Sequence, residues 1–172
     1  TEPLLEKAWT MALADGHASD AELHKLEQIA DELGISAGEL AGWRHQWTEH
    51  AVELAEHTAA FAAVLIHHDG TIDADEATQF RALLDRLPLG EHRREQLAAN
   101  LLTTPPALDH VGASLAALPR ERRISVLRSL APLVAASSRA DLGRAFFLDL
   151  ARTAAIPVEQ AVAILASPLA TA

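Results

Sequence analysis

An acidic turn of one pattern occurs twice in this chain, and it constrains the fold more than any other feature. The first copy, residues 15–22, reads Asp-Gly-His-Ala-Ser-Asp-Ala-Glu, and the second, residues 69–76, reads Asp-Gly-Thr-Ile-Asp-Ala-Asp-Glu. Each copy lies between apolar stretches with helical periodicity. Gly permits a sharp turn, and Ser or Asp followed three residues later by Glu forms a capping box at a helix start. The repetition therefore predicts two helical hairpins of one type.

The composition favours helices throughout. Apolar residues make up 49% of the 172 residues and aromatic residues only 4%, so Ala and Leu, which are strong helix formers, must build most of the core. We expect one all-α domain over residues 1–166, a compact bundle of about eight to ten helices made of degenerate helical-hairpin repeats. A degenerate third copy of the hairpin is expected at 130–165, and the tail 167–172 is expected to fray.

Periodicity and cap signals also predict where the helices lie. In the first two helices, apolar residues such as Leu4, Ile29 and Leu33 are expected to face the core. Pro132 is expected to kink its helix or to split it near Ala131. The expected helices cover residues 2–14, 20–33, 37–48, 50–67, 74–87, 91–102, 107–117, 120–136, 139–154 and 157–166.

The charge balance limits the classes of partner. Twenty-four acidic and 14 basic residues give a formal net charge of −10, which disfavours nucleic acid and suits a basic protein partner or a divalent cation of unknown identity. The absence of Cys excludes disulfides and thiolate sites. No apolar run is long enough for a transmembrane helix, so a cytoplasmic protein is expected. Because the chain begins with Thr1 rather than Met, we expect that a preceding segment was removed.

Two stretches carry a family resemblance. Residues 11–16, Met-Ala-Leu-Ala-Asp-Gly, lead to Leu-Gly-Ile-Ser at 33–36, and residues 61–87 repeat the arrangement. This pattern resembles the TerB-like domain of bacterial tellurite-resistance proteins. The resemblance implies an all-helical module in tellurite or stress resistance, without a defined enzymatic reaction. It also implies that acidic residues bind a divalent metal, and by position these are Asp15, Glu22, Asp69, Asp73 and Glu76.

The second turn also resembles the latter half of an EF-hand loop. Gly70, Ile72 and Glu76 have the required spacing, but Leu65 and His67 occupy positions where that loop needs oxygen ligands. A complete calcium loop is therefore not expected. A partial site of oxygen ligands is compatible with the spacing, and so is a purely structural turn in which the acidic residues only cap the helix.

The segment His67-His68-Asp69 is the sharpest local cluster of metal-ligand types. With Asp73 and Glu76 it offers the nitrogen and oxygen ligands that zinc, iron or manganese accept. Alternatively, the two histidines are favoured there only because the negative end of the helix dipole attracts them. We therefore assign Asp15, Glu22, His67, His68, Asp69, Asp73 and Glu76 as candidate metal ligands and name no catalytic residue.

Three functions remain open on the sequence. Nucleophile-elbow, phosphate-loop, dinucleotide and His-Glu-x-x-His motifs are absent, which favours a non-enzymatic module that binds a protein partner, with a cation at the acidic turns. A metal-dependent enzyme that uses His67, His68 and Asp69 is the first alternative. A structural scaffold or an acidic inhibitor of a basic partner is the second.

Overall fold

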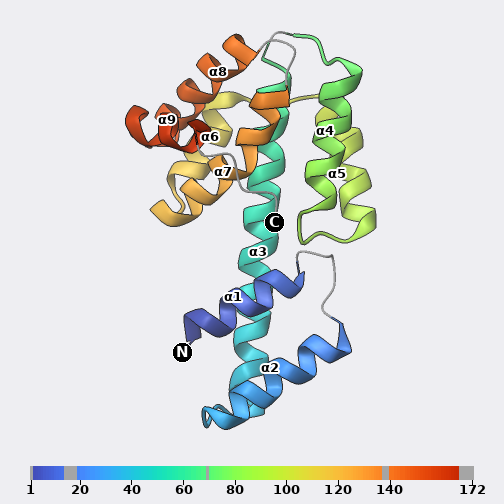
Figure 1. The fold of residues 1–172 in the computed structure, drawn as a ribbon. Helices are drawn as coiled ribbons and strands as arrows, with labels where there is room; N and C mark the ends of the chain where they lie inside the picture. Colours follow the sequence, from blue (N-terminus) through green and yellow to red (C-terminus); the bar gives the residue numbers. More distant parts are fainter. Residues whose placement is uncertain (1, 14–18, 69, 137–139, 167–172) are drawn as a thin grey trace.

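The fold is all-helical. The computed structural model describes residues 2–13, 19–68, 70–136 and 140–166, and these ranges form nine helices and no strand (Figure 1). The predicted class is thus confirmed, whereas the frayed tail lies outside the described residues and the extent of a single domain stays a prediction. The helices are α1 (Glu2–Leu13), α2 (Asp20–Glu32), α3 (Ala37–Ile66), α4 (Ala74–Asp85), α5 (Glu91–Thr103), α6 (Leu108–Ala116), α7 (Arg120–Ala136), α8 (Ala140–Thr153) and α9 (Val158–Ala166).

The longest helix, α3, is the axis of the molecule. Its 30 residues span about 45 Å, and it packs against α1, α2 and each helix from α4 to α8. The prediction of two helices, 37–48 and 50–67, was wrong. No Gly or Pro lies between positions 43 and 66, and Thr48, at the expected break, donates its hydroxyl to the Arg44 carbonyl at 2.7 Å. Nothing in this stretch therefore interrupts the helix.

Pro132 does not split α7. The helix runs from Arg120 to Ala136 as one element. Of the two expected outcomes, the split near Ala131 did not occur, and the kink stays a prediction. Pro132 is exposed, and on that side of a helix water can satisfy the backbone group that the missing N–H leaves open.

Two hydrophobic clusters lie along α3. The smaller one joins α1, α2 and the first half of α3 through the buried side chains of Leu5, Leu26, Ala30, Leu40 and Trp47. The larger one begins further along α3 and includes three Phe side chains without exposed surface, on α3, α4 and α8. Figure 1 shows the same division, with α1 and α2 beside one half of α3 and the other helices around its second half.

We call α1, α2 with its C-cap Leu33, and residues 37–50 of α3 the N-terminal lobe. Its interior is held by aromatic and polar contacts as well as by aliphatic ones. The Trp9 indole N–H donates to the Thr48 hydroxyl at 2.9 Å, and the Arg44 guanidinium lies 5.6 Å from the centre of the Trp9 ring. Trp43 and Trp47 pack with their ring centroids 5.8 Å apart. These contacts fix α1 across α3, so the lobe is a small packed unit.

Capping boxes are present at the starts of α2, α3 and α4, and those of α2 and α4 are the ones predicted in the two acidic turns. The pairs are Ser19 with Glu22, Ser36 with Glu39 and Asp73 with Glu76. In each pair the first side chain accepts a hydrogen bond from the backbone N–H of the Glu, and the Glu carboxylate accepts one from the backbone N–H of the first residue. Each box therefore satisfies two N–H groups that a helix start would otherwise leave unpaired.

Helices α2 and α8 end in the same way, whereas the expected third copy of the hairpin at 130–165 stays a prediction. Gly34, after α2, and Ala155, after α8, have positive φ angles of 75° and 56°. The residues that follow, Ile35 and Ile156, each donate a backbone N–H to the carbonyl five residues earlier, at 2.9 and 2.8 Å. This is a Schellman ending, which reverses the chain. It brings α3 back onto α2 and α9 back onto α8.

We expect Glu39→Gln to make the stability of the fold less sensitive to acid. Hydrogen bonds from the Ser36 hydroxyl and the Ser36 backbone N–H hold the pKa of Glu39 below its ordinary value of 4.5. A pKa lowered by folding stabilises the protein fully above the unfolded pKa, and this stabilisation is lost as the pH falls through the folded pKa. Urea unfolding should show native and variant proteins differing at about pH 6 and converging near pH 3.

The exposed carboxylate of Glu159, in the first turn of α9, provides the matched control. Glu159→Gln should not reproduce the convergence. A difference between Glu39→Gln and the native protein that stays constant with pH would contradict the role of the carboxylate charge.

We expect Gly34→Ala and Ala155→Gly to change stability in opposite directions. Both positions have positive φ, which costs an L-residue about 1 kcal/mol and costs Gly nothing. No atom lies within 4 Å of a Cβ added at Gly34, so backbone conformation alone should set the effect. Thermal unfolding should show a fall of about 2–4 °C for Gly34→Ala and a rise of similar size for Ala155→Gly.

Gly42 gives the reference for an ordinary helical glycine. It lies inside α3 without a positive φ and with open space around an added Cβ, so Gly42→Ala should raise stability. If Gly34→Ala were also stabilising, the Schellman ending would not depend on the positive φ of that residue.

Candidate functional site

Four of the predicted metal-site residues lie in the corner between α3 and α4. His67 is the C-terminal cap of α3 and His68 follows it, whereas Asp73 caps α4 and Glu76 lies in the first turn of α4. Asp69, predicted for the same corner, lies outside the described residues, as does Asp15. The two histidines and the two acidic residues therefore come from the end of one helix and the start of the next.

His67 is held by a backbone carbonyl of another helix. Its Nε2 lies 2.7 Å from the carbonyl oxygen of Leu101. A carbonyl can only accept a hydrogen bond, so Nε2 carries the proton and donates it. This bond attaches the end of α3 to α5 and leaves Nδ1 as the nitrogen of His67 that bears a lone pair.

His68 has the opposite tautomer. Its Nδ1 lies 2.6 Å from the carbonyl oxygen of Leu65 and must donate to it, so the lone pair is on Nε2. Nε2 is buried and has no hydrogen-bond partner among the described residues. The ring packs against Phe146 of α8, with centroids 5.5 Å apart. Burying an unpaired polar atom costs free energy, so the state of this nitrogen needs an explanation.

A small cavity adjoins both His68 and Glu76. It has a volume of about 10 Å³, which is the space that one water molecule needs. Leu133 and Val134 of α7 and Gly143 of α8 complete much of its wall. The lining therefore combines three polar residues, His68, Glu76 and Gln79, with apolar groups.

Glu76 is buried for a carboxylate, with 8% of its surface exposed. Its Oε2 accepts the Asp73 backbone N–H at 3.1 Å, and the Glu76 backbone N–H donates to Asp73 Oδ1 at 2.7 Å. The negative charges also lie at the positive end of the α4 dipole, which stabilises them. The capping box thus fixes the Glu76 carboxylate beside the cavity.

The first acidic corner, at the start of α2, is exposed to solvent, whereas Glu76 in the second corner is buried. Ser19 donates to Glu22 Oε2 from its backbone N–H at 2.8 Å and from its hydroxyl at 2.7 Å, and both side chains are exposed. Figure 1 shows the starts of α2 and α4 well separated along the α3 axis. Glu22 therefore does not share a site with Glu76. Over the described ranges, which omit residues 15 and 69, no group of three or more His, Asp or Glu side chains is arranged to bind one metal ion.

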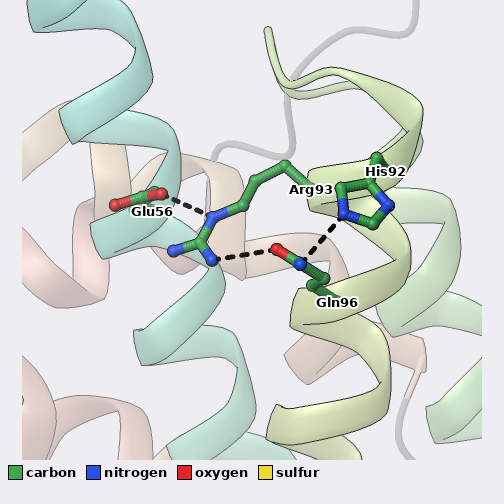
Figure 2. Close-up of polar contacts among 4 residues, drawn as sticks. All are labelled: Glu56, His92, Arg93 and Gln96. Atoms are coloured by element: carbon green, nitrogen blue, oxygen red, sulfur yellow. Dashed lines mark hydrogen bonds and ion pairs between the residues drawn. The ribbon is translucent and has the colours of Figure 1, made fainter.

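A polar network attaches α5 to the middle of α3 (Figure 2). Arg93 Nε donates to Glu56 Oε1 at 2.8 Å, and a second guanidinium nitrogen lies 3.5 Å from Gln96 Oε1. The Gln96 amide in turn donates to His92 Nε2 at 3.0 Å. Glu56 thus takes part in a contact between α3 and α5, and it belongs to neither acidic corner.

The first half of α3 also faces α7 across a cleft of about 620 Å³ between α1, α3 and α7. Arg122 of α7 donates to His50 Nδ1 at 3.0 Å across this cleft. The neighbouring Arg123 donates to the carbonyl of Ala154 at 2.9 Å and so caps the end of α8. These arginines therefore serve packing between helices.

The surface feature that sequence reasoning missed is on the N-terminal lobe. Four of the six exposed large apolar side chains in the described part of the chain lie there, namely Leu4, Met11, Ile29 and Leu33, which are 74%, 66%, 46% and 51% exposed. The expectation that Leu4, Ile29 and Leu33 face the core was therefore wrong. Leu26 and Ala30 already fill the buried side of α2, so Ile29 and Leu33 project beyond it.

Met11 and Ile29 border a groove of about 500 Å³ between α1 and α2. The groove is also lined by Ala8 and Ala12 and by the charged side chains of Glu22 and Lys25. In the sequence, the spacing of Leu4, Ala8 and Met11 at i, i+4 and i+7 is a second apolar stripe on the first helix. That spacing was the signal that could have revealed this surface.

A comparison with known protein families found a match in the N-terminal lobe. Residues 2–45 match the family model of tellurite resistance protein TerB. This segment is similar to TerB. The match covers α1, α2 and the first part of α3, which includes the stretch 11–36 on which the resemblance was strongest. It supports the predicted TerB-like character of these residues, and a TerB-like domain over residues 1–166 stays a prediction.

The TerB match ends within α3, so the corner between α3 and α4 lies beyond it. We found no match among curated proteins and none among solved structures. In the described part of the chain, no helix combines the length and the apolar character needed to cross a membrane.

Proposed function

We propose that this chain is a non-enzymatic, cytoplasmic TerB-like module of tellurite or stress resistance, which binds a protein partner and holds a divalent cation at its second acidic corner. The binding of a partner is inferred from the concentration of exposed apolar side chains on α1 and α2. Exposed apolar patches on soluble proteins mark interaction sites. The TerB-like segment coincides with this surface.

The hydrogen bonds at the second corner favour a binding role over a hydrolytic one. His67 donates its Nε2 proton to a main-chain carbonyl, and the Asp73 carboxylate caps α4. Both groups thus contribute to the structure of the corner, whereas a general base needs a lone pair directed at a substrate.

The cation is supported by the tautomer of His68. An imidazole whose Nδ1–H donates to a backbone carbonyl presents its Nε2 lone pair, which is the usual arrangement for a histidine that ligates a metal. This Nε2 is buried without a partner in the described ranges, and Glu76 lines the same cavity. One nitrogen and one carboxylate suit Zn²⁺ or Mn²⁺ better than Ca²⁺. Asp69, adjacent in sequence, is the third ligand that we propose.

We expect the chain to bind Zn²⁺ or Mn²⁺ more tightly than Ca²⁺, and His68→Phe to weaken the binding at least tenfold. Phe can keep the ring contact with Phe146 but has no nitrogen to ligate the metal. Isothermal titration of the metal-free protein with each ion would measure both effects. Asp69→Asn should weaken the same binding.

His110, an exposed histidine of α6, provides the matched control. His110→Phe should leave the affinity unchanged. Absence of heat with all three ions, or equal affinity in the His68→Phe and native proteins, would remove the cation from the proposed function. Partner binding would not be affected by that outcome.

We expect a photo-reactive residue at position 11 to form a covalent adduct with a partner protein in tellurite-resistant cells. Benzoylphenylalanine would replace either Met11, on the N-terminal lobe, or Leu142, which is 53% exposed on α8. Adducts should form from position 11 and not from position 142. Absence of adducts from both positions would contradict partner binding, whereas adducts from position 142 alone would keep a partner but place it on another surface.

A further inference from the structure

We propose that the groove between α1 and α2 binds one basic amphipathic α-helix of a protein partner. The inference rests on the proposed partner-binding function and specifies its chemistry. It depends on three features of the N-terminal lobe, which are the shape of the groove, the apolar side chains that border it and the charge of the lobe.

The shape of the groove suits a helix. Ala8 and Ala12 of α1 line it and are small, so a partner can approach the backbone of α1 closely. Met11 on one side and Ile29 on the other are exposed, and Met adapts its shape to different apolar surfaces. An amphipathic helix that inserts its apolar side chains between two helices is an established mode of recognition. It would cover the apolar side chains that the lobe leaves in water.

The negative charge of the lobe indicates that the partner is positively charged. Residues 1–50 contain ten acidic and three basic residues, whereas residues 51–172 contain 14 and 11, so the first segment carries −7 of the formal net charge of −10. Of its three basic residues, Arg44 packs against Trp9 and lies 3.8 Å from Glu27. Lys25 lines the groove together with Glu22, so these two charges cancel and the acidic excess of the lobe lies outside the groove lining. A concentrated negative field attracts a basic partner and accelerates its association.

The same field argues against other occupants of the groove. A second copy of the chain would bring two lobes of equal negative charge together, and like charges opposed at an interface weaken it. A membrane surface rich in anionic lipid would repel the lobe for the same reason. A helix with Leu on one face and Lys or Arg on the other can place apolar side chains in the groove and is also attracted by the negative charge of the lobe.

The test uses a synthetic helical peptide of about 18 residues, which spans about 27 Å, with Leu at i, i+3, i+4 and i+7 positions and Lys elsewhere. Fluorescence anisotropy of the labelled peptide should show saturable 1:1 binding to the full chain. Met11→Gln/Ile29→Gln should weaken the binding at least tenfold. Leu142→Gln/Val158→Gln, which alters two exposed apolar side chains outside the lobe, should change it by less than about twofold.

Two further peptides test whether binding depends on the order of the residues and on the charge of the peptide. A peptide of the same composition in scrambled order should bind at least tenfold more weakly, and a peptide with Glu in place of Lys should not bind. Raising NaCl from about 50 mM to 500 mM should weaken binding to the native chain. If circular dichroism shows loss of helix in the double variant, the single variant Met11→Gln, at a position 66% exposed, replaces it.

Besides failure of the peptide to bind, three kinds of result would overturn the proposal. The first is equal affinity for the ordered and scrambled peptides, or equal affinity of the native and Met11→Gln/Ile29→Gln chains. The second is a dimer of the native chain in sedimentation that the double variant abolishes, which would assign the groove to a second copy. The third is binding to vesicles of anionic lipid that the double variant loses. If the peptide does not bind but position 11 forms an adduct in cells, the proposal of a basic helix in the groove is overturned, whereas the proposed binding of a protein partner stands.

Discussion

The continuity of α3 is the constraint on which the rest of the structure depends. This helix contributes Leu40 and Trp47 to the smaller hydrophobic cluster, and it contributes buried apolar side chains between Ala55 and Ile66 to the larger one. Neither cluster could form without it, because α1 and α2 pack on its first half and α4 to α8 largely on its second. A break near residue 49 would let the two groups of helices move relative to each other. The unbroken helix instead fixes the acidic corner after α3 at a distance from the groove between α1 and α2.

Helix capping and metal binding require the same residue types, and this limits what the acidic turns can reveal on their own. Asp73 and Glu76 satisfy each other's backbone N–H groups, so their presence is explained without a ligand. His68 is not explained in this way, because its buried Nε2 bears a lone pair that no described group uses. A cation at this corner is therefore supported by the histidine more than by the repeated carboxylates.

Local signals were predictable from the sequence, and long-range ones were not. The capping boxes of the two acidic turns depend on residues within a few positions of each other, and they formed as predicted. The division of α3 was predicted wrongly because a change in packing partners along one helix resembles a change of helix in the apolar pattern. The exposure of Leu4 and Ile29 depends on how far α1 and α2 lie from other helices, which periodicity does not encode. The tautomer of His68 depends on a carbonyl placed by the fold.

The two candidate sites have different consequences for how such a module could work. The groove lies in the segment that matches TerB, and this segment also holds most of the negative charge. The corner with His68 lies in the larger cluster, enclosed by α3, α4, α7 and α8, where a bound cation would neutralise a buried carboxylate and strengthen the packing of four helices. A cation there would not touch the partner in the groove. Its effect would be on the stability of the unit that anchors α3, and α3 in turn holds α1 and α2 in the geometry that the partner meets.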